Sequence, residues 1–110
     1  MSRTAAPDLD RVARALADGT RRSLLLLVRD GERAAGELAS EFSPMSRPAV
    51  SQHLRVLEEA GLVTVRSVGS RRLYRARTES LDLVSQFIDD MWSDGPKRLK
   101  RAAEAVERYL

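Results

Sequence analysis

Apolar residues in the first part of the chain recur mostly at three- and four-residue spacing, which predicts helices. The first helix is expected to begin at Asp8, a good capping residue, and its apolar stripe is Leu9, Val12, Ala13 and Leu16. A second helix is expected to follow the break at residues 18–20 and to run to about Asp30. Its apolar run, Leu24 to Val28, predicts that it is the central buried helix, and Gly31 is expected to end it.

Two shorter helices joined by a turn are expected next. The third covers about residues 35–42, with Leu38, Ala39 and Phe42 facing inward. Pro44 disfavours helix at the residue before it and predicts a turn. Ser46 is then placed to cap a fourth helix, in whose first turn Pro48 is tolerated. The core stripe of this helix is Val50, Leu54 and Leu57, and Gly61 is its expected stop.

After residue 61 the apolar period shortens toward two, which predicts strands at residues 62–66 and 72–76. The hairpin tip between them is expected at residues 67–71, around Gly69. Two short helices and a hairpin in this order are typical of a winged helix-turn-helix. The predicted fold is therefore mainly α with a small β-hairpin.

The last part of the chain returns to helical spacing. Thr78 or Ser80 is expected to cap a final helix, and its apolar positions resume after Ser93. Pro96 either kinks one long helix or begins a second one. We expect a single domain over residues 1–110. Its parts are a DNA-binding core at 8–78, with a recognition helix at 46–60 and a wing at 62–77, and a dimerisation segment at 79–110.

Composition narrows the classes of function. The 110 residues are 43% hydrophobic and 32% charged, which suits one globular domain rather than a disordered tail. They include no cysteine and one histidine, His53, so thiolate metal sites, cysteine nucleophiles and sites with two imidazoles within one chain are excluded. No apolar run is long enough to span a membrane, and residues 1–7 hold no signal-peptide stretch, so no membrane partner and a cytoplasmic location are expected.

Positive charge is concentrated in one segment. Residues 46–77 contain seven arginines against Glu58 and Glu59, a net charge of +5 in a chain whose total is +3. The ordinary interpretation of such a cluster of arginines is a basic face that contacts only solvent. Because these arginines lie on an expected recognition helix and wing, contact with double-stranded DNA is favoured instead.

The fourth helix supplies the candidates for reading bases: Ser46, Arg47, Ser51, Gln52, His53 and Arg55. Arg47 is suited to guanine and Gln52 to adenine. For three of these residues a structural role is the alternative. Ser46 can be only a helix cap, Arg55 can pair with Glu58 or Glu59, and His53 can pack beside the core. A metal or catalytic role for His53 is disfavoured, because no second ligand accompanies it.

The predicted wing contributes a second set of candidates, Arg66, Ser70, Arg71 and Arg72. Arginines on a hairpin can lie along the DNA backbone or in the minor groove and neutralise phosphates.

The chain resembles the ArsR/SmtB family of bacterial winged-helix repressors over about residues 9–92. The similarity is carried by residues 15–22, Gly36-Glu37-Leu38-Ala39, residues 46–57 and residues 60–63, and the hairpin 69–74 fits as well. The resemblance implies a homodimer, an inverted-repeat operator, and repression released by a signal.

Several positions depart from the family pattern. Gly19 replaces a common proline, and Ala34 replaces a capping Thr or Ser. The cysteine positions of arsenic-sensing members match Ala34, Gly36 and Ala39. The last helix, where zinc-sensing members have Asp and His ligands, offers Asp82, Asp89, Asp90 and Asp94 but no histidine. We therefore expect no metal and no cofactor, and the effector is left open.

An apolar surplus in the terminal helices predicts the dimer contact. The expected contact residues are Leu9, Val12, Leu16, Leu81, Val84, Phe87, Ile88, Met91, Trp92 and Leu99. An enzyme is disfavoured, because the chain has no glycine-rich phosphate loop, metal-ligand set or nucleophile-elbow motif. The remaining alternative is a winged-helix protein–protein assembly module that does not bind DNA.

Overall fold

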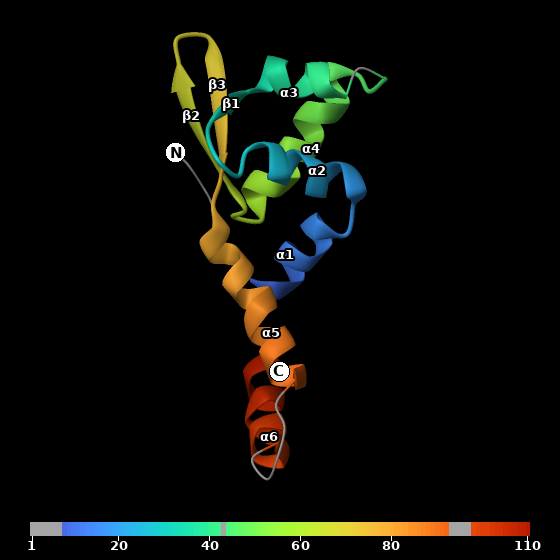
Figure 1. Cartoon of the computed structure of the whole chain (residues 1–110), viewed down its shortest axis with the longest axis vertical. Helices are drawn as coiled ribbons and strands as arrows, with labels where there is room; N and C mark the ends of the chain where they lie inside the picture. The colour runs from blue at the N-terminus through green and yellow to red at the C-terminus, as the bar shows by residue number, and fades with distance from the viewer. Residues whose placement is uncertain (1–7, 43, 93–97) are drawn as a thin grey trace.

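The structure is a computed structural model and describes residues 8–42, 44–92 and 98–110. Its elements in chain order are α1 (Leu9–Leu16), α2 (Gly19–Leu27), β1 (Arg33–Ala34), α3 (Ala35–Glu41), α4 (Arg47–Glu59), β2 (Val63–Val68), β3 (Arg71–Ala76), the short 3-10 helix η1 (Thr78–Leu81), α5 (Asp82–Trp92) and α6 (Arg98–Tyr109). The sheet, α3 and α4 lie toward one end of the molecule, and the α5–α6 pair forms the other end (Figure 1). The mainly helical fold with a small winged sheet is thus confirmed.

Three helices begin at a side chain that accepts a hydrogen bond from the backbone N–H three residues ahead. These caps are Asp8 (2.9 Å), Asp18 (3.1 Å) and Ser46 (3.2 Å). The cap position of α3 is Ala34, which has no oxygen to offer. Here the Glu37 carboxylate instead accepts a hydrogen bond from the Ala34 N–H (3.1 Å) and satisfies one free donor.

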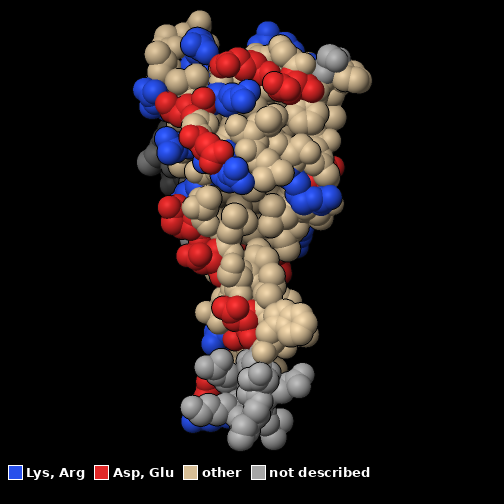
Figure 2. All heavy atoms as spheres, viewed as in Figure 1, with Lys and Arg blue, Asp and Glu red and all other residues tan. Residues whose placement is uncertain are grey.

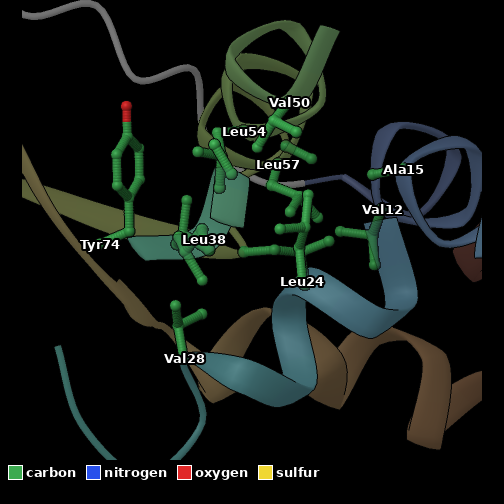
Figure 3. Packing of buried hydrophobic residues seen from close by; sticks show 13 residues of the cluster. Val12, Ala15, Leu24, Val28, Leu38, Val50, Leu54, Leu57 and Tyr74 are labelled. Carbon is green, nitrogen blue, oxygen red and sulfur yellow. The ribbon is translucent and has the colours of Figure 1, made fainter. Parts of the chain in front are cut away.

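One hydrophobic core joins α1–α4 to the base of the sheet. Its fully buried side chains include Val12, Leu24, Leu38, Leu54 and Leu57. Figure 3 shows these side chains converging from the four helices, with Tyr74 of β3 at the edge of the cluster. The predicted core stripes of the third and fourth helices are confirmed, with Phe42 only half-buried.

The second helix is less buried than predicted, and the prediction that it runs to about Asp30 was wrong. Leu24 is buried, but Leu26 is 64% exposed, because α1 and α4 cover only one face of α2. The helix ends at Leu27, and Gly31 has no part in its end. The Val28 carbonyl accepts a hydrogen bond from the Ala76 N–H (2.9 Å), so the chain leaves the helix where it meets β3.

The sheet has three antiparallel strands in the order β1–β3–β2. The hairpin strands extend further than predicted, since Val68 pairs with Arg71 and leaves a loop of only Gly69 and Ser70. Gly69 has φ +60°, a conformation that suits glycine at the first position of a type II′ turn. The sequence analysis missed β1, whose two residues are too few to show a period of two.

Neither Thr78 nor Ser80 caps the last helical segment as predicted, since η1 already begins at Thr78 and has no side-chain cap. Ser80 is buried in η1, and its hydroxyl donates a hydrogen bond to the Gly61 carbonyl (2.6 Å). Gly61, with φ 76°, ends α4 as expected. The Ser80 hydrogen bond therefore ties the end of α4 to the start of the C-terminal helices.

The C-terminal segment forms two helices rather than one kinked helix. α6 packs alongside α5 (Figure 1): the Phe87 and Tyr109 rings meet edge to face at 5.3 Å, and Arg108 donates a hydrogen bond to the Asp90 carboxylate. The Tyr109 hydroxyl also donates to Asp90 (3.1 Å). Pro96 lies outside the described residues.

Candidate nucleic-acid interface

The start of α4 presents a polar face to solvent. Packing of Val50, Leu54 and Leu57 into the core fixes the rotation of the helix. Four candidate side chains are therefore exposed: Arg47, Ser51, Gln52 and Arg55. Ser46 is exposed as well and is the helix cap, as one of its two interpretations predicted. A short exposed helix of this kind has the width that the major groove of DNA accommodates.

His53 lies at the side of the core stripe and is half-buried. Its Nδ1 lies 3.3 Å from Arg21 Nη1, while Arg21 also donates to the Ala15 carbonyl (2.8 Å) and the Arg14 carbonyl (2.9 Å). Because a guanidinium only donates, Nδ1 is the acceptor in this contact. The contact supports the interpretation of His53 as a packing residue that fixes α4 against α2.

The wing arginines are paired with carboxylates. Arg66 forms two hydrogen bonds with Glu32 (2.9 and 2.7 Å), Arg71 pairs with Glu37 (3.1 Å), and Arg72 lies 3.9 Å from Glu58. Each acidic partner comes from outside the hairpin. The hydrogen bond from Arg66 lowers the pKa of Glu32, and the same bond raises the pKa of Arg66.

These ion pairs offset part of the net positive charge that the sequence places in residues 46–77. Over the end of the molecule with the hairpin and α3, acidic and basic groups alternate (Figure 2). Among the described residues, Arg55 forms no ion pair with Glu58 or Glu59, since Glu58 faces Arg72. The sequence analysis missed Glu32 and Glu37, because both partners lie 34 positions from their arginines.

A cavity of about 550 Å³ lies between the start of α3, the start of α4 and the hairpin. Its lining includes five of the predicted site residues: Arg47, Ser51, Ser70, Arg71 and Arg72. Gly36 and Glu37 of α3 complete one side, and a Cβ at Gly36 would lie 3.6 Å from Arg47 Nη2. Three segments separated in sequence thus meet in one arginine-rich hollow.

The predicted dimer contacts fall into three groups. Val12 is fully buried within the chain, so its side chain has no surface left for a partner, contrary to expectation. Leu9, Leu16, Leu81 and Val84 are half-buried, whereas Phe87, Ile88, Met91 and Trp92 are exposed. The side chain of Leu99 lies outside the described residues.

None of the helices within residues 8–42, 44–92 and 98–110 is long and apolar enough to cross a membrane. In the same ranges, no three Asp, Glu or His side chains gather in a group that could hold a metal ion.

Comparison with known proteins places this geometry in context. Residues 16–66 match the family model described as a helix-turn-helix domain. The HTH-type transcriptional regulator Rv2034 of Mycobacterium tuberculosis is 46% identical over 84 residues, which cover 76% of this chain and 78% of that protein.

Two solved structures are also similar. The ArsR-like transcriptional regulator from Rhodococcus sp. RHA1 is 30% identical, with a TM-score of 0.73 over 91% of both chains. The homodimeric winged helix-turn-helix DNA-binding domain Mb0332 of Mycobacterium bovis is 32% identical, with a TM-score of 0.62 over 78% of this chain and 82% of that one.

Proposed function

The chain belongs to the ArsR/SmtB family of winged-helix transcriptional regulators, and from this premise we propose that it is a repressor that binds an inverted-repeat DNA operator as a homodimer. The observation that carries the proposal is the hollow that α4 shares with the hairpin, where Arg47 and Ser51 lie beside Ser70, Arg71 and Arg72. Such an arrangement suits a helix in the major groove with a wing on the adjacent backbone.

In this proposal α4 contacts the bases and the hairpin contacts the phosphates. Arg47 and Gln52 read base edges, with Ser51 and Arg55 beside them on the exposed face of α4. Arg66, Arg71 and Arg72 contact phosphates, with Ser70 at the hairpin tip. His53 acts through its contact with Arg21, which holds α4 in place. The DNA-binding core then spans residues 8–78, and residues 79–110 form the dimerisation segment.

The proposed dimer is supported by the exposed apolar stripe of α5. Ile88, Met91 and Trp92 lie on neighbouring turns and are 46%, 62% and 79% exposed. Exposed apolar groups gathered on one face favour an interface over solvent, and two-fold symmetric dimers are the commonest oligomers. The homodimeric state of the similar Mycobacterium bovis domain supports the same arrangement.

The signal that would release repression is not an arsenical bound by thiolates, because these 110 residues contain no cysteine. Two measurements test the proposal. The preferred duplex is selected from a random pool, and its affinity is then compared with that of a scrambled duplex by fluorescence anisotropy. We expect a palindromic site bound at least 1,000-fold more tightly than the scrambled duplex, on the order typical of specific regulators. Equal affinity for both duplexes would contradict sequence-specific recognition, and the absence of binding to either duplex would favour an assembly module.

A further inference from the structure

A second cavity, of about 290 Å³, lies away from the α4 face, between α2 and η1. Its apolar lining comes from the end of α1, from α2, from the end of β3 and from η1: Leu16, Leu25, Leu26, Ala76 and Leu81. Leu26 is 64% exposed, so the cavity opens to solvent beside this side chain. An apolar hollow of this kind would gain stability from an apolar occupant.

Three arginines border the same cavity through their carbon chains, because its lining is almost wholly apolar: Arg22, Arg29 and Arg77. Arg29 already forms two hydrogen bonds with Asp30 (3.1 Å each), and Arg77 lies 3.5 Å from Glu79. Arg22 donates to the Leu16 carbonyl (2.7 Å), a neutral partner, and within the described part of the chain it forms no ion pair with a carboxylate. An occupant with an anionic group is therefore favoured over a neutral or cationic one.

The volume sets the size of the occupant. A water molecule accounts for about 30 Å³ of liquid, and a methylene group is of similar size, so the cavity accommodates roughly ten such groups. This is the lower end of the range of small-molecule sites, which run from about 300 to 1,000 Å³.

We propose that this cavity binds a medium-chain carboxylate, with its chain among the leucines and its carboxylate on Arg22, and that the bound molecule changes affinity for DNA. The second half of the proposal rests on the proposed function. The cavity lies where the winged core joins the C-terminal helices, since Ala76 is bonded to the end of α2 and Leu81 leads directly into α5. A molecule wedged between α2 and η1 thus shifts α5 relative to the core.

The test uses the full chain and decanoate below its micellar concentration, in isothermal titration calorimetry. We expect one decanoate per protomer, and binding at least tenfold weaker for decanol and for decylamine, which keep the chain but lack the negative charge. Two variants test the two halves of the site: Arg22→Gln removes the cation, and Leu26→Glu places a carboxylate at the exposed opening. Each is expected to weaken decanoate binding at least tenfold, while Arg11→Gln, an exposed arginine of α1, leaves it unchanged.

Several outcomes would overturn the proposal. These are the absence of decanoate binding, equal binding of decylamine, or binding that Leu26→Glu leaves intact. Dissociation of a dimer in step with decanoate saturation would assign the cavity to the contact between two copies, and would overturn the proposal as well.

The effect of decanoate on DNA affinity is tested separately, by repeating the anisotropy titration with the selected duplex at saturating decanoate. An unchanged DNA affinity overturns the regulatory half alone, whereas failure to bind any duplex overturns the proposed function and leaves the calorimetric result standing.

Discussion

Arg66 on β2 and Glu32 beside β1 face each other through two parallel hydrogen bonds, of 2.9 Å from Nε and 2.7 Å from Nη2. The guanidinium proposed to contact a DNA phosphate is thus already held by a carboxylate of its own chain. A phosphate must displace Glu32 to bind in the same bidentate manner. Competition from Glu32 therefore lowers the affinity of the wing for DNA, because the Arg66 guanidinium is not free to bind a phosphate.

Replacing Glu32 is expected to release this restraint. Glu32→Gln should raise the affinity for any duplex by no more than a few-fold, because it frees the Arg66 guanidinium from an ion pair that is exposed and therefore weak. It should also steepen the salt dependence, as Arg66 gains a phosphate contact. Anisotropy titrations over a range of salt concentrations measure both effects. Glu104→Gln on α6 removes the same charge far from the hairpin (Figure 1) and should change little. If both variants bind equally tightly, total charge rather than the pair with Arg66 governs affinity.

The same ion pair predicts a dependence of stability on pH. Because the hydrogen bond from Arg66 lowers the pKa of Glu32 in the folded chain, the pair stabilises the fold above the pKa of the unfolded chain. This contribution is lost as the pH falls through the lower, folded-state pKa. The urea midpoint of wild type should therefore exceed that of Glu32→Gln near pH 7, and the difference should shrink as the pH falls below the ordinary glutamate pKa and through the lower, folded-state pKa. A difference that does not change with pH over this range would show that the glutamine acts through something other than charge.

Ser80 offers a test of how the core is joined to the C-terminal helices. Ser80→Ala removes the buried hydrogen bond to the Gly61 carbonyl, and should lower the free energy of unfolding by about 1 kcal/mol. Urea denaturation followed by circular dichroism measures the loss. Ser85→Ala, at an exposed position of α5, serves as the control and should be nearly neutral. Equal stability of the two variants would mean that the Gly61 carbonyl finds another partner.

Much of the fold was predictable because its signals are local. The caps at Asp8 and Ser46 and the stripe of Val50, Leu54 and Leu57 each depend on residues within a few positions of one another. The exposure of Leu26 was not predictable, since an apolar run in the sequence does not show how many faces of its helix other elements will cover. β1 was missed because its two residues become a strand only by pairing with β3.

The candidate site divides in the same way. The exposure of Gln52 follows from helix periodicity once the core stripe is known. The partners of Arg66 and Arg71 could not be predicted, because charge counting records the arginines of residues 46–77 and not the carboxylates that fold onto them. Ser80 looked like a helix cap, and only the tertiary structure brings it to Gly61.

Base reading and phosphate binding should separate in two variants. Gln52→Ala should cost about 1–3 kcal/mol on the preferred duplex and relax preference at one base pair per half-site. Arg71→Ala should weaken binding to all duplexes alike, and should flatten the salt dependence by about one unit of slope for each lost phosphate contact, roughly two for a dimer. A salt titration on specific and random duplexes distinguishes the two effects.

The control for that comparison is Arg11→Ala, which removes an exposed arginine of α1 whose ion-pair partner among the described residues is the cap residue, Asp8. It should leave the preference and the salt slope nearly unchanged. Equal weakening of both duplexes by Gln52→Ala would contradict the proposed orientation of α4. A wing arginine that enters a narrow minor groove would instead make Arg71→Ala sequence-dependent.

The exposed stripe of α5 predicts how the dimer can be broken. Phe87 packs against Tyr109 of α6, whereas Ile88, Met91 and Trp92 remain exposed on the helix. Ile88→Glu should convert a dimer into a folded monomer, because a charge buried in an apolar contact without a partner is strongly unfavourable. Sedimentation equilibrium at micromolar concentration measures the mass, and circular dichroism checks that the helices persist. Leu26→Glu is a matched control, since it places the same charge at an exposed leucine outside the stripe. The DNA affinity of Ile88→Glu should fall sharply, as one half-site is then bound without the other. A wild-type chain that sediments as a monomer would rule out the dimer, and an Ile88→Glu variant that remains dimeric would place the contact elsewhere.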